Sequence, residues 1–300
     1  MLKIAFHPSY YHIIPKGHRF PMEKYELLPQ QLLHEGTIEE DAFFKPEIID
    51  RKHILAVHDE QYVNDLFGLK LDRRAQRKTG FIHDEGLILR EKLIMEGTRK
   101  CCEYALVNGV SMNIAGGTHH SFTNRGEGFC LLNDQAIAAQ WLLDTKQANK
   151  ILIIDLDVHQ GNGTAQIFQD NPNVFTFSMH GGNNYPLKKE KSDLDIPLAD
   201  GIEDNEYIYL LESSLSEILK DFNPDFLFFQ SGIDIIDTDK LGRLNVSIKG
   251  CKRRDEIVIN LAKELNLPLV ISMGGGYSKE IKHIIEAHAN TYRTAQYIFF

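Results

Sequence analysis

Short apolar segments that end in polar or glycine-rich turns are the feature of this sequence that most constrains its fold. Such segments, almost free of polar side chains, are typical of parallel strands covered by helices on both faces. Helical patterns separate them, so the sequence predicts βαβ units. We expect a first strand within Met1–Phe6 and further strands at Met112–Ala115, Ile151–Val158, Val174–Ser178, Phe226–Gln230 and Leu269–Met273.

Helices are predicted from apolar spacing and from signals at their ends. We expect them at Arg90–Val107, Tyr207–Leu219, Ser247–Leu265 and Ser278–His288, with Asp204 as the cap of the second. No repeat, low-complexity tract or Pro/Ser-rich linker divides the chain. We therefore predict one domain over residues 1–300, a three-layer α/β fold whose central, mostly parallel sheet is flanked by helices.

Composition and charge exclude several classes of protein. The formal charge of −9 gives a field that repels a phosphate backbone, so nucleic-acid binding is not expected. Apolar stretches are far shorter than the roughly 20 residues that span a bilayer. The N-terminus reaches His7 and Pro8 before a signal peptide can form, so we expect a cytoplasmic protein. The basic run from Lys70 to Lys78 is interpreted as a solvated loop or helix face.

The first strand end with candidate chemistry follows Ile151–Ile154. Strand alternation predicts that Asp155, Asp157 and His159 share one face. Two carboxylates and an imidazole are costly to bury unpaired, and a divalent cation would offset that cost. The alternative is that Asp155 caps the next helix and that His159 is an ordinary surface histidine.

A second strand end supplies Asp234, after Phe226–Gln230. With Asp157 and His159 it makes a set of three oxygen and nitrogen ligands that leaves a position for water, as in catalytic zinc sites. Taken alone, Asp234 is explained equally well as a helix N-cap.

Two further turns carry histidine and tyrosine. His119 and His120 follow Gly116-Gly117, and the residues alone allow metal ligands, acid/base groups or an incidental surface pair. The run Gly274–Gly276 lacks the spacing of a phosphate-binding loop. It is interpreted as a tight turn that presents Tyr277, whose hydroxyl can donate to a substrate oxygen on which negative charge develops.

Taken together and in this order, these motifs resemble the zinc-dependent histone deacetylase family, most closely its class IV branch and bacterial relatives. The matching segments cover nearly the whole chain: His18–Pro21, Val57-His58, Gly116–His120, Gly126–Cys130, Asp155–Gly163, Gly232–Gly242 and Gly274–Tyr277. The resemblance implies an arginase/deacetylase-like fold. It also implies hydrolysis of an amide that joins an acetyl or longer acyl group to lysine in a protein or peptide, or to a small amine such as a polyamine.

Carried over by motif, the resemblance implies that Asp157, His159 and Asp234 bind Zn²⁺, with Fe²⁺ as an alternative. Tyr277 would polarise the substrate carbonyl.

The same resemblance implies that His119 and His120 transfer protons, with Asp155 oriented toward His119 and Asn162 near His120. We prefer His120 as the general base that later acts as the general acid.

Two further sets of residues are implied in the same way. The walls of the substrate channel would include Gly128, Phe129, Tyr185 and Gly275. A structural K⁺ or Na⁺ would be held by Asp155, Asp157, His159, Ser178 and Met179.

Two rival functions are weighed against the deacylase. A binuclear manganese ureohydrolase needs further aspartates where this chain has Gly161 and Ile236. A silent acyl-lysine binding module would have lost Tyr277, a histidine of the pair or a metal ligand, and none is missing. The sequence does not indicate the oligomeric state or the length of the acyl chain.

Overall fold

The computed structural model describes residues 1–300 and contains one eight-stranded sheet. The strand order is β2-β1-β3-β8-β7-β4-β5-β6, and every neighbouring pair is parallel. The strands are β1 (Lys3–Ala5), β2 (Phe43–Phe44), β3 (Val110–Asn113), β4 (Ile151–Asp155), β5 (Val174–Gly181), β6 (Leu194–Leu198), β7 (Phe226–Gln230) and β8 (Leu269–Ser272). The predicted α/β architecture is confirmed, and the sheet is parallel throughout.

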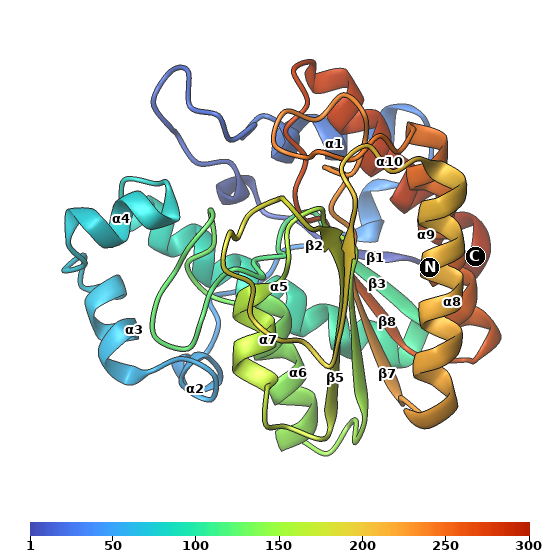
Figure 1. Cartoon of the computed structure of the whole chain (residues 1–300). Coiled ribbons are helices and arrows are strands. Elements are labelled where there is room, and N and C mark those ends of the chain that lie inside the picture. Colours follow the sequence, from blue (N-terminus) through green and yellow to red (C-terminus); the bar gives the residue numbers. More distant parts are fainter.

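Helices cover both faces of the sheet and make three layers (Figure 1). They are α1 (Lys24–His34), α2 (Arg51–Leu55), α3 (Glu60–Phe67), α4 (Arg73–Thr79), α5 (Glu85–Asn108), α6 (Asp134–Asp144), α7 (Asn162–Phe168), α8 (Asp204–Asp221), α9 (Ile248–Glu264) and α10 (Ile281–Phe299). Helices α5 to α7 lie on one side, and α8 to α10 lie on the other with α1 beside α10 (Figure 1). One hydrophobic cluster of 79 buried residues fills the layers. No helix combines the length and apolar character needed to cross a membrane.

The predicted central strands are present, but the ends of all except β7 differ. The strand expected at Ile151–Val158 stops at Asp155. Beyond it the chain bends, because Asp155 Oδ1 accepts the N–H of Asp157 at 3.2 Å and Asp157 Oδ1 accepts the N–H of His159 at 3.0 Å. Simple alternation across residues 155–159 was therefore the wrong reason for placing these side chains together.

The predicted cap of α8 was also wrong. Glu203 occupies the N-cap position, whereas the Asp204 carboxylate accepts the N–H and the hydroxyl of Ser247 at 2.7 and 2.6 Å. Ser247 caps α9 by accepting the N–H of Gly250. Asp204 thus joins the starts of two neighbouring helices rather than capping one.

An ion pair joins the first and last helices, and it gives a prediction about stability. Arg293 of α10 donates to both carboxylate oxygens of Glu35, which follows α1, at 2.8 and 2.6 Å. These bonds lower the pKa of Glu35 from 4.5 to about 2. The pair therefore stabilises the folded chain fully above pH 4.5, and the contribution is lost as pH falls toward 2.

We expect Glu35→Gln to lower the free energy of unfolding by about 1 kcal/mol at pH 7, since both side chains are partly exposed. Urea unfolding at several pH values checks this, and the difference from wild type should shrink below pH 4.5. Glu47→Gln, which removes an exposed and unpaired carboxylate, is the control. A difference that stays constant with pH would contradict the assignment.

Candidate active site

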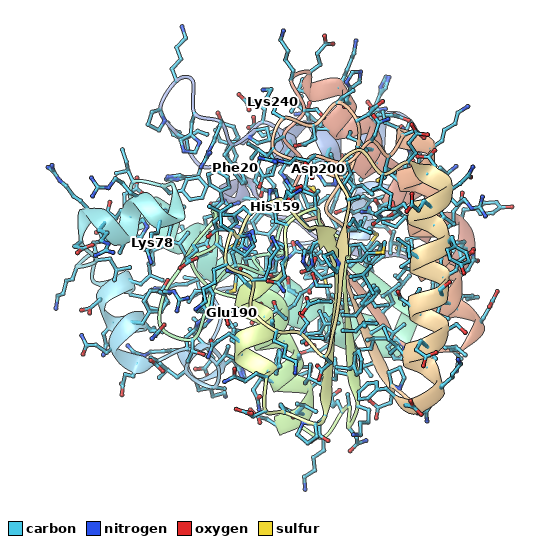
Figure 2. All side chains as sticks on the ribbon, viewed as in Figure 1. Phe20, Lys78, His159, Glu190, Asp200 and Lys240 are labelled. Carbon is cyan, nitrogen blue, oxygen red and sulfur yellow. The ribbon has the colours of Figure 1, made fainter.

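The candidate site lies at the ends of four adjacent strands in the middle of the sheet. In the order β3-β8-β7-β4, each strand is followed by one of the predicted segments. These segments carry His119 and His120, Tyr277, Asp234, and Asp155 to His159. Parallel strands end at the same edge of a sheet, so the side chains meet there although up to half the chain separates them. His159 lies at this edge of the sheet (Figure 2).

Asp157, His159 and Asp234 form the one cluster of three or more potential metal ligands in the chain. Their ligand atoms lie within 4.8 Å of one another, and all three residues are buried. His159 Nδ1 is 3.0 Å from Asp157 Oδ1 and 3.1 Å from Asp234 Oδ2. Burial and the negative charge of Asp157 raise the pKa of Asp234. Two buried carboxylates so close together need a cation, and this donor set fits Zn²⁺ or Fe²⁺.

Gly275 closes one side of this cluster by approaching it with its backbone. Its N–H donates to Asp157 Oδ2 at 2.8 Å. A Cβ atom at this position would lie 2.1 Å from Asp234 Oδ2, so any side chain would enter the space between the ligands. Gly275, predicted as a channel wall, thus borders the ligand cluster itself.

Arg254 of α9 fixes the two segments that carry the ligands. It is fully buried and paired with Asp255 at 2.7 Å. Its guanidinium also donates to the carbonyl of Leu156 at 3.2 Å and to that of Ser231 at 3.3 Å. One rigid side chain therefore sets the spacing between the end of β4 and the end of β7.

The two histidines have unlike partners. His119 Nδ1 is 2.7 Å from Asp155 Oδ2, and His120 Nδ1 is 2.7 Å from Asn162 Oδ1. Burial opposes protonation of His119, but the charges of Asp155 and Asp157 outweigh it and raise its pKa to about 9. Burial and the neighbouring histidines lower the pKa of His120 well below its usual value. The two partners therefore favour a protonated His119 and a neutral His120, whose Nε2 is left free by the contact of Nδ1 with Asn162.

The rings of Phe129 and Tyr185, both predicted as channel walls, line a cavity beside these groups. The ring centroids of Phe129 and Tyr277 are 5.8 Å apart, and Tyr185 stands edge-on to His120 at 5.0 Å. Gly128 has a φ of +53°, and a Cβ there would lie 2.5 Å from His120 Cδ2. A side chain at position 128 would therefore press on the histidine pair and narrow the channel.

The orientation of Tyr277 is fixed through its backbone. Its N–H donates to Asp239 Oδ2 at 2.6 Å, and the preceding turn is held by Lys24 Nζ, which donates to the Gly274 carbonyl at 2.9 Å. Burial and the charges of the two ligand aspartates raise the pKa of Tyr277 well above its usual value. The hydroxyl therefore stays protonated and can donate a hydrogen bond.

Two residues of this site were given no role from the sequence, although one of them, Phe20, lies in the matching segment His18–Pro21. Phe20 packs against Phe129 and Tyr277 at centroid distances of 5.1 and 6.1 Å. Lys24 is fully buried, and burial lowers its pKa to about 8. The spacing Lys24, Leu28, Leu32 places the lysine on the apolar stripe of α1, which was the available signal.

The residues predicted for a monovalent cation come from neighbouring strands. The register of β4 with β5 pairs Asp155 with Ser178, and Met179 follows. The Ser178 hydroxyl is 2.9 Å from His180 Nδ1, so the histidine already occupies one side of it.

A second metal of the ureohydrolase kind has no carboxylates here. A Cβ at Gly161 would lie 2.2 Å from Asp155 Oδ2, and Ile236 is buried in the core. The structure therefore offers a single ligand cluster.

A parallel α/β sheet whose strand ends bring together a buried ligand cluster, a histidine pair and a tyrosine fits a hydrolase of the deacetylase type. The histone deacetylase domain matches residues 18–292. The chain belongs to the histone deacetylase family, whose members hydrolyse amide bonds.

Several proteins and solved structures are similar to this chain over most of its length. The chain is 40% identical over 296 residues to an uncharacterised protein of Picosynechococcus, covering 99% of both chains. It is 30% identical to histone deacetylase 2 of Arabidopsis thaliana, covering 91% of this chain and 73% of that one. A solved histone deacetylase homologue in complex with SAHA matches with a TM-score of 0.85 and 25% identity, covering 98% of this chain and 84% of that one. A homologue from Aquifex aeolicus shares the fold with a TM-score of 0.83.

Proposed function

We propose that this protein is a zinc-dependent lysine deacylase in which residues 1–300 act as one catalytic domain. The observation that carries the proposal is the ligand cluster of Asp157, His159 and Asp234 beside two histidines, one held by a carboxylate and the other by an amide. The aromatic channel suits the thin alkyl stem of an acylated lysine. The complex of a solved homologue with SAHA supports this substrate class, and we expect SAHA to bind in the same channel here.

The bound ion would supply Lewis-acid activation of the amide carbonyl and of the attacking water. His120 Nε2 accepts the proton of that water, because Asn162 holds the opposite nitrogen of the ring. His119, held by Asp155, keeps a positive charge beside the reacting atoms. The Tyr277 hydroxyl donates to the carbonyl oxygen as negative charge develops on it. His120 then returns its proton to the leaving amine.

Two finer assignments belong to the same proposal. Asp155, Ser178 and Met179, with the main chain at Asp157 and His159, would hold K⁺ or Na⁺. The protein would belong to class IV, and Asn162 agrees with this because the best-studied class I enzymes have an acid there, whereas class II and class IV members have asparagine.

Hydrolysis of acyl-lysine peptides of different chain length tests the proposal. We expect one metal ion per chain by elemental analysis, loss of turnover on chelation and recovery with Zn²⁺. Acetyl-lysine turnover by a fully chelated protein would overturn the proposal.

Tyr277→Phe should lower kcat/KM by about 10²-fold, because one hydrogen bond to the developing oxyanion is lost. Metal content should stay unchanged, since Tyr277 is not a member of the ligand cluster. Tyr209→Phe, an exposed tyrosine of α8, is the matched control and should behave as wild type. Near-wild-type activity of Tyr277→Phe would remove the tyrosine from the mechanism.

A further inference from the structure

The mouth of the channel is surrounded by basic side chains. The cavity that contains Phe129 and Tyr277 opens to solvent between Arg19, Lys78 and Arg243, all of which are exposed. Lys78 is the last basic residue of α4, on the side of the molecule left of His159 in the view of Figure 2. The chain as a whole carries a net charge of −9, so the positive charge at the mouth is local and could not be predicted from the composition.

No aspartate or glutamate lines this cavity, and the nearby carboxylates already have partners. Glu127 accepts from Arg125 and from the Tyr185 hydroxyl, both at 2.8 Å. Asp239 accepts three backbone N–H groups, at 2.6, 2.8 and 3.0 Å. A cationic substrate would therefore meet positive charge at the mouth and no free carboxylate.

Arg19 is the cation best placed to meet a substrate. Its guanidinium lies over the Phe129 ring at 5.2 Å, and stacking of this kind holds the side chain in place. Lys78 and Arg243 each have a carboxylate 3.5 Å away, on Glu127 and Asp200, whereas Arg19 has none within ion-pair distance. Its planar fork of donors matches a carboxylate in a bidentate pair.

We propose that Arg19, assisted by Lys78 and Arg243, selects acyl-lysine substrates that carry a carboxylate close to the acylated lysine. This inference rests on the proposed function and narrows its substrate class. The carboxylate comes either from an acidic residue beside the lysine or from the lysine's own C-terminus. Acylated polyamines, whose remaining amines are positively charged, are poor substrates on this reading. The basic run from Lys70 to Lys78, interpreted from the sequence as a solvated face, thus places its last residue at the site.

The test compares acetyl-lysine peptides that differ only in the two neighbours of the lysine, which are glutamate, glutamine or lysine. For the wild-type holoenzyme at low salt, kcat/KM should fall in that order. An exposed ion pair contributes a factor of up to about five, so Arg19→Gln should lower kcat/KM for the glutamate peptide about fivefold through KM. The ratio of kcat/KM for the glutamate peptide to that for the glutamine peptide should fall in Arg19→Gln. Adding Lys78→Gln and Arg243→Gln should remove the preference.

Two controls show whether the preference depends on the position of the positive charge and which carboxylate of the substrate is recognised. Arg253→Gln removes the same charge from an exposed position on α9, away from the mouth, and should leave the preference intact. Glutamine-flanked peptides that end in acetyl-lysine, as free acid or as amide, distinguish the two sources of the carboxylate. A preference for the free acid assigns the C-terminal carboxylate, and a preference only for glutamate neighbours assigns the side chain.

Equal kcat/KM for the glutamate and lysine peptides, or an unchanged ratio in Arg19→Gln, would overturn the inference while leaving the deacylase intact. If the glutamine peptide is not hydrolysed at all, the proposed function fails instead. In that case the role of Arg19, Lys78 and Arg243 in substrate selection is tested by binding alone. Dissociation constants of the same peptides are measured by fluorescence anisotropy. Equal affinities of the glutamate and lysine peptides would overturn that role.

Discussion

Replacing Asp234 with asparagine is expected to abolish both metal binding and turnover without destabilising the metal-free protein. The Asp234 side chain is fully buried, and its Oδ1 accepts the N–H of Val158 at 2.9 Å. Asparagine keeps this bond and its shape but removes one of two carboxylates that repel each other beside His159. The metal-free variant should therefore be about as stable as wild type, because the relief of repulsion between the two carboxylates offsets the weaker contact of His159 Nδ1 with residue 234.

Elemental analysis, peptide hydrolysis and thermal unfolding of Asp234→Asn test this together. We expect no bound metal, no detectable turnover and no rise in melting temperature on addition of Zn²⁺, whereas wild type should be stabilised by the ion. Asp134→Asn is the contrasting variant. Asp134 is a buried carboxylate outside the ligand cluster, and it accepts hydrogen bonds from Thr118, Thr98 and Ser272. The Asp134→Asn variant should be less stable than wild type but still bind one metal ion per chain. Full metal content in Asp234→Asn would remove Asp234 from the ligand set.

The residues of the site could be predicted because they follow the ends of central strands. An unbroken apolar run such as Phe226–Gln230 fixes where a strand ends, and its prediction matches β7 in both bounds. Parallel pairing then brings Asp234 to the same edge as the turn that follows β3. The meeting of His119 with Asp155 at 2.7 Å is a consequence of that shared edge.

Local bends of the backbone and the directions of side chains could not be predicted from the sequence in this way. The turns after Asp155 depend on hydrogen bonds between side chains and the backbone, which strand periodicity does not describe. The first helix and the short edge strands β2 and β6 were missed because they are brief or only partly apolar. Whether an exposed cation such as Arg19 faces a channel depends on how distant loops pack, and its neighbours in sequence do not specify that.

The strongest prediction about the mechanism is that the two histidines differ in protonation. Adjacent imidazoles with ring centroids 4.1 Å apart cannot both be positively charged at low cost. Asp155 stabilises the charge on His119, whereas the neutral amide of Asn162 does not stabilise a charge on His120 in the same way. The choice of carboxylate or amide as the partner thus decides which histidine is free to accept a proton at neutral pH.

His120→Ala is accordingly expected to lower kcat/KM by about 10³-fold, within the range for loss of a general base. Metal content should be unchanged, because His120 is not a member of the ligand cluster. Asn162→Asp extends the test. A carboxylate at Nδ1 would raise the pKa of His120, so its base form would be lost at higher pH and the acid limb of the kcat/KM profile should move upward. His34→Ala, at an exposed position near the end of α1, is the control and should match wild type in rate and profile. If His120→Ala retained most of the activity, or if Asn162→Asp left the acid limb in place, the general base would have to be sought in His119.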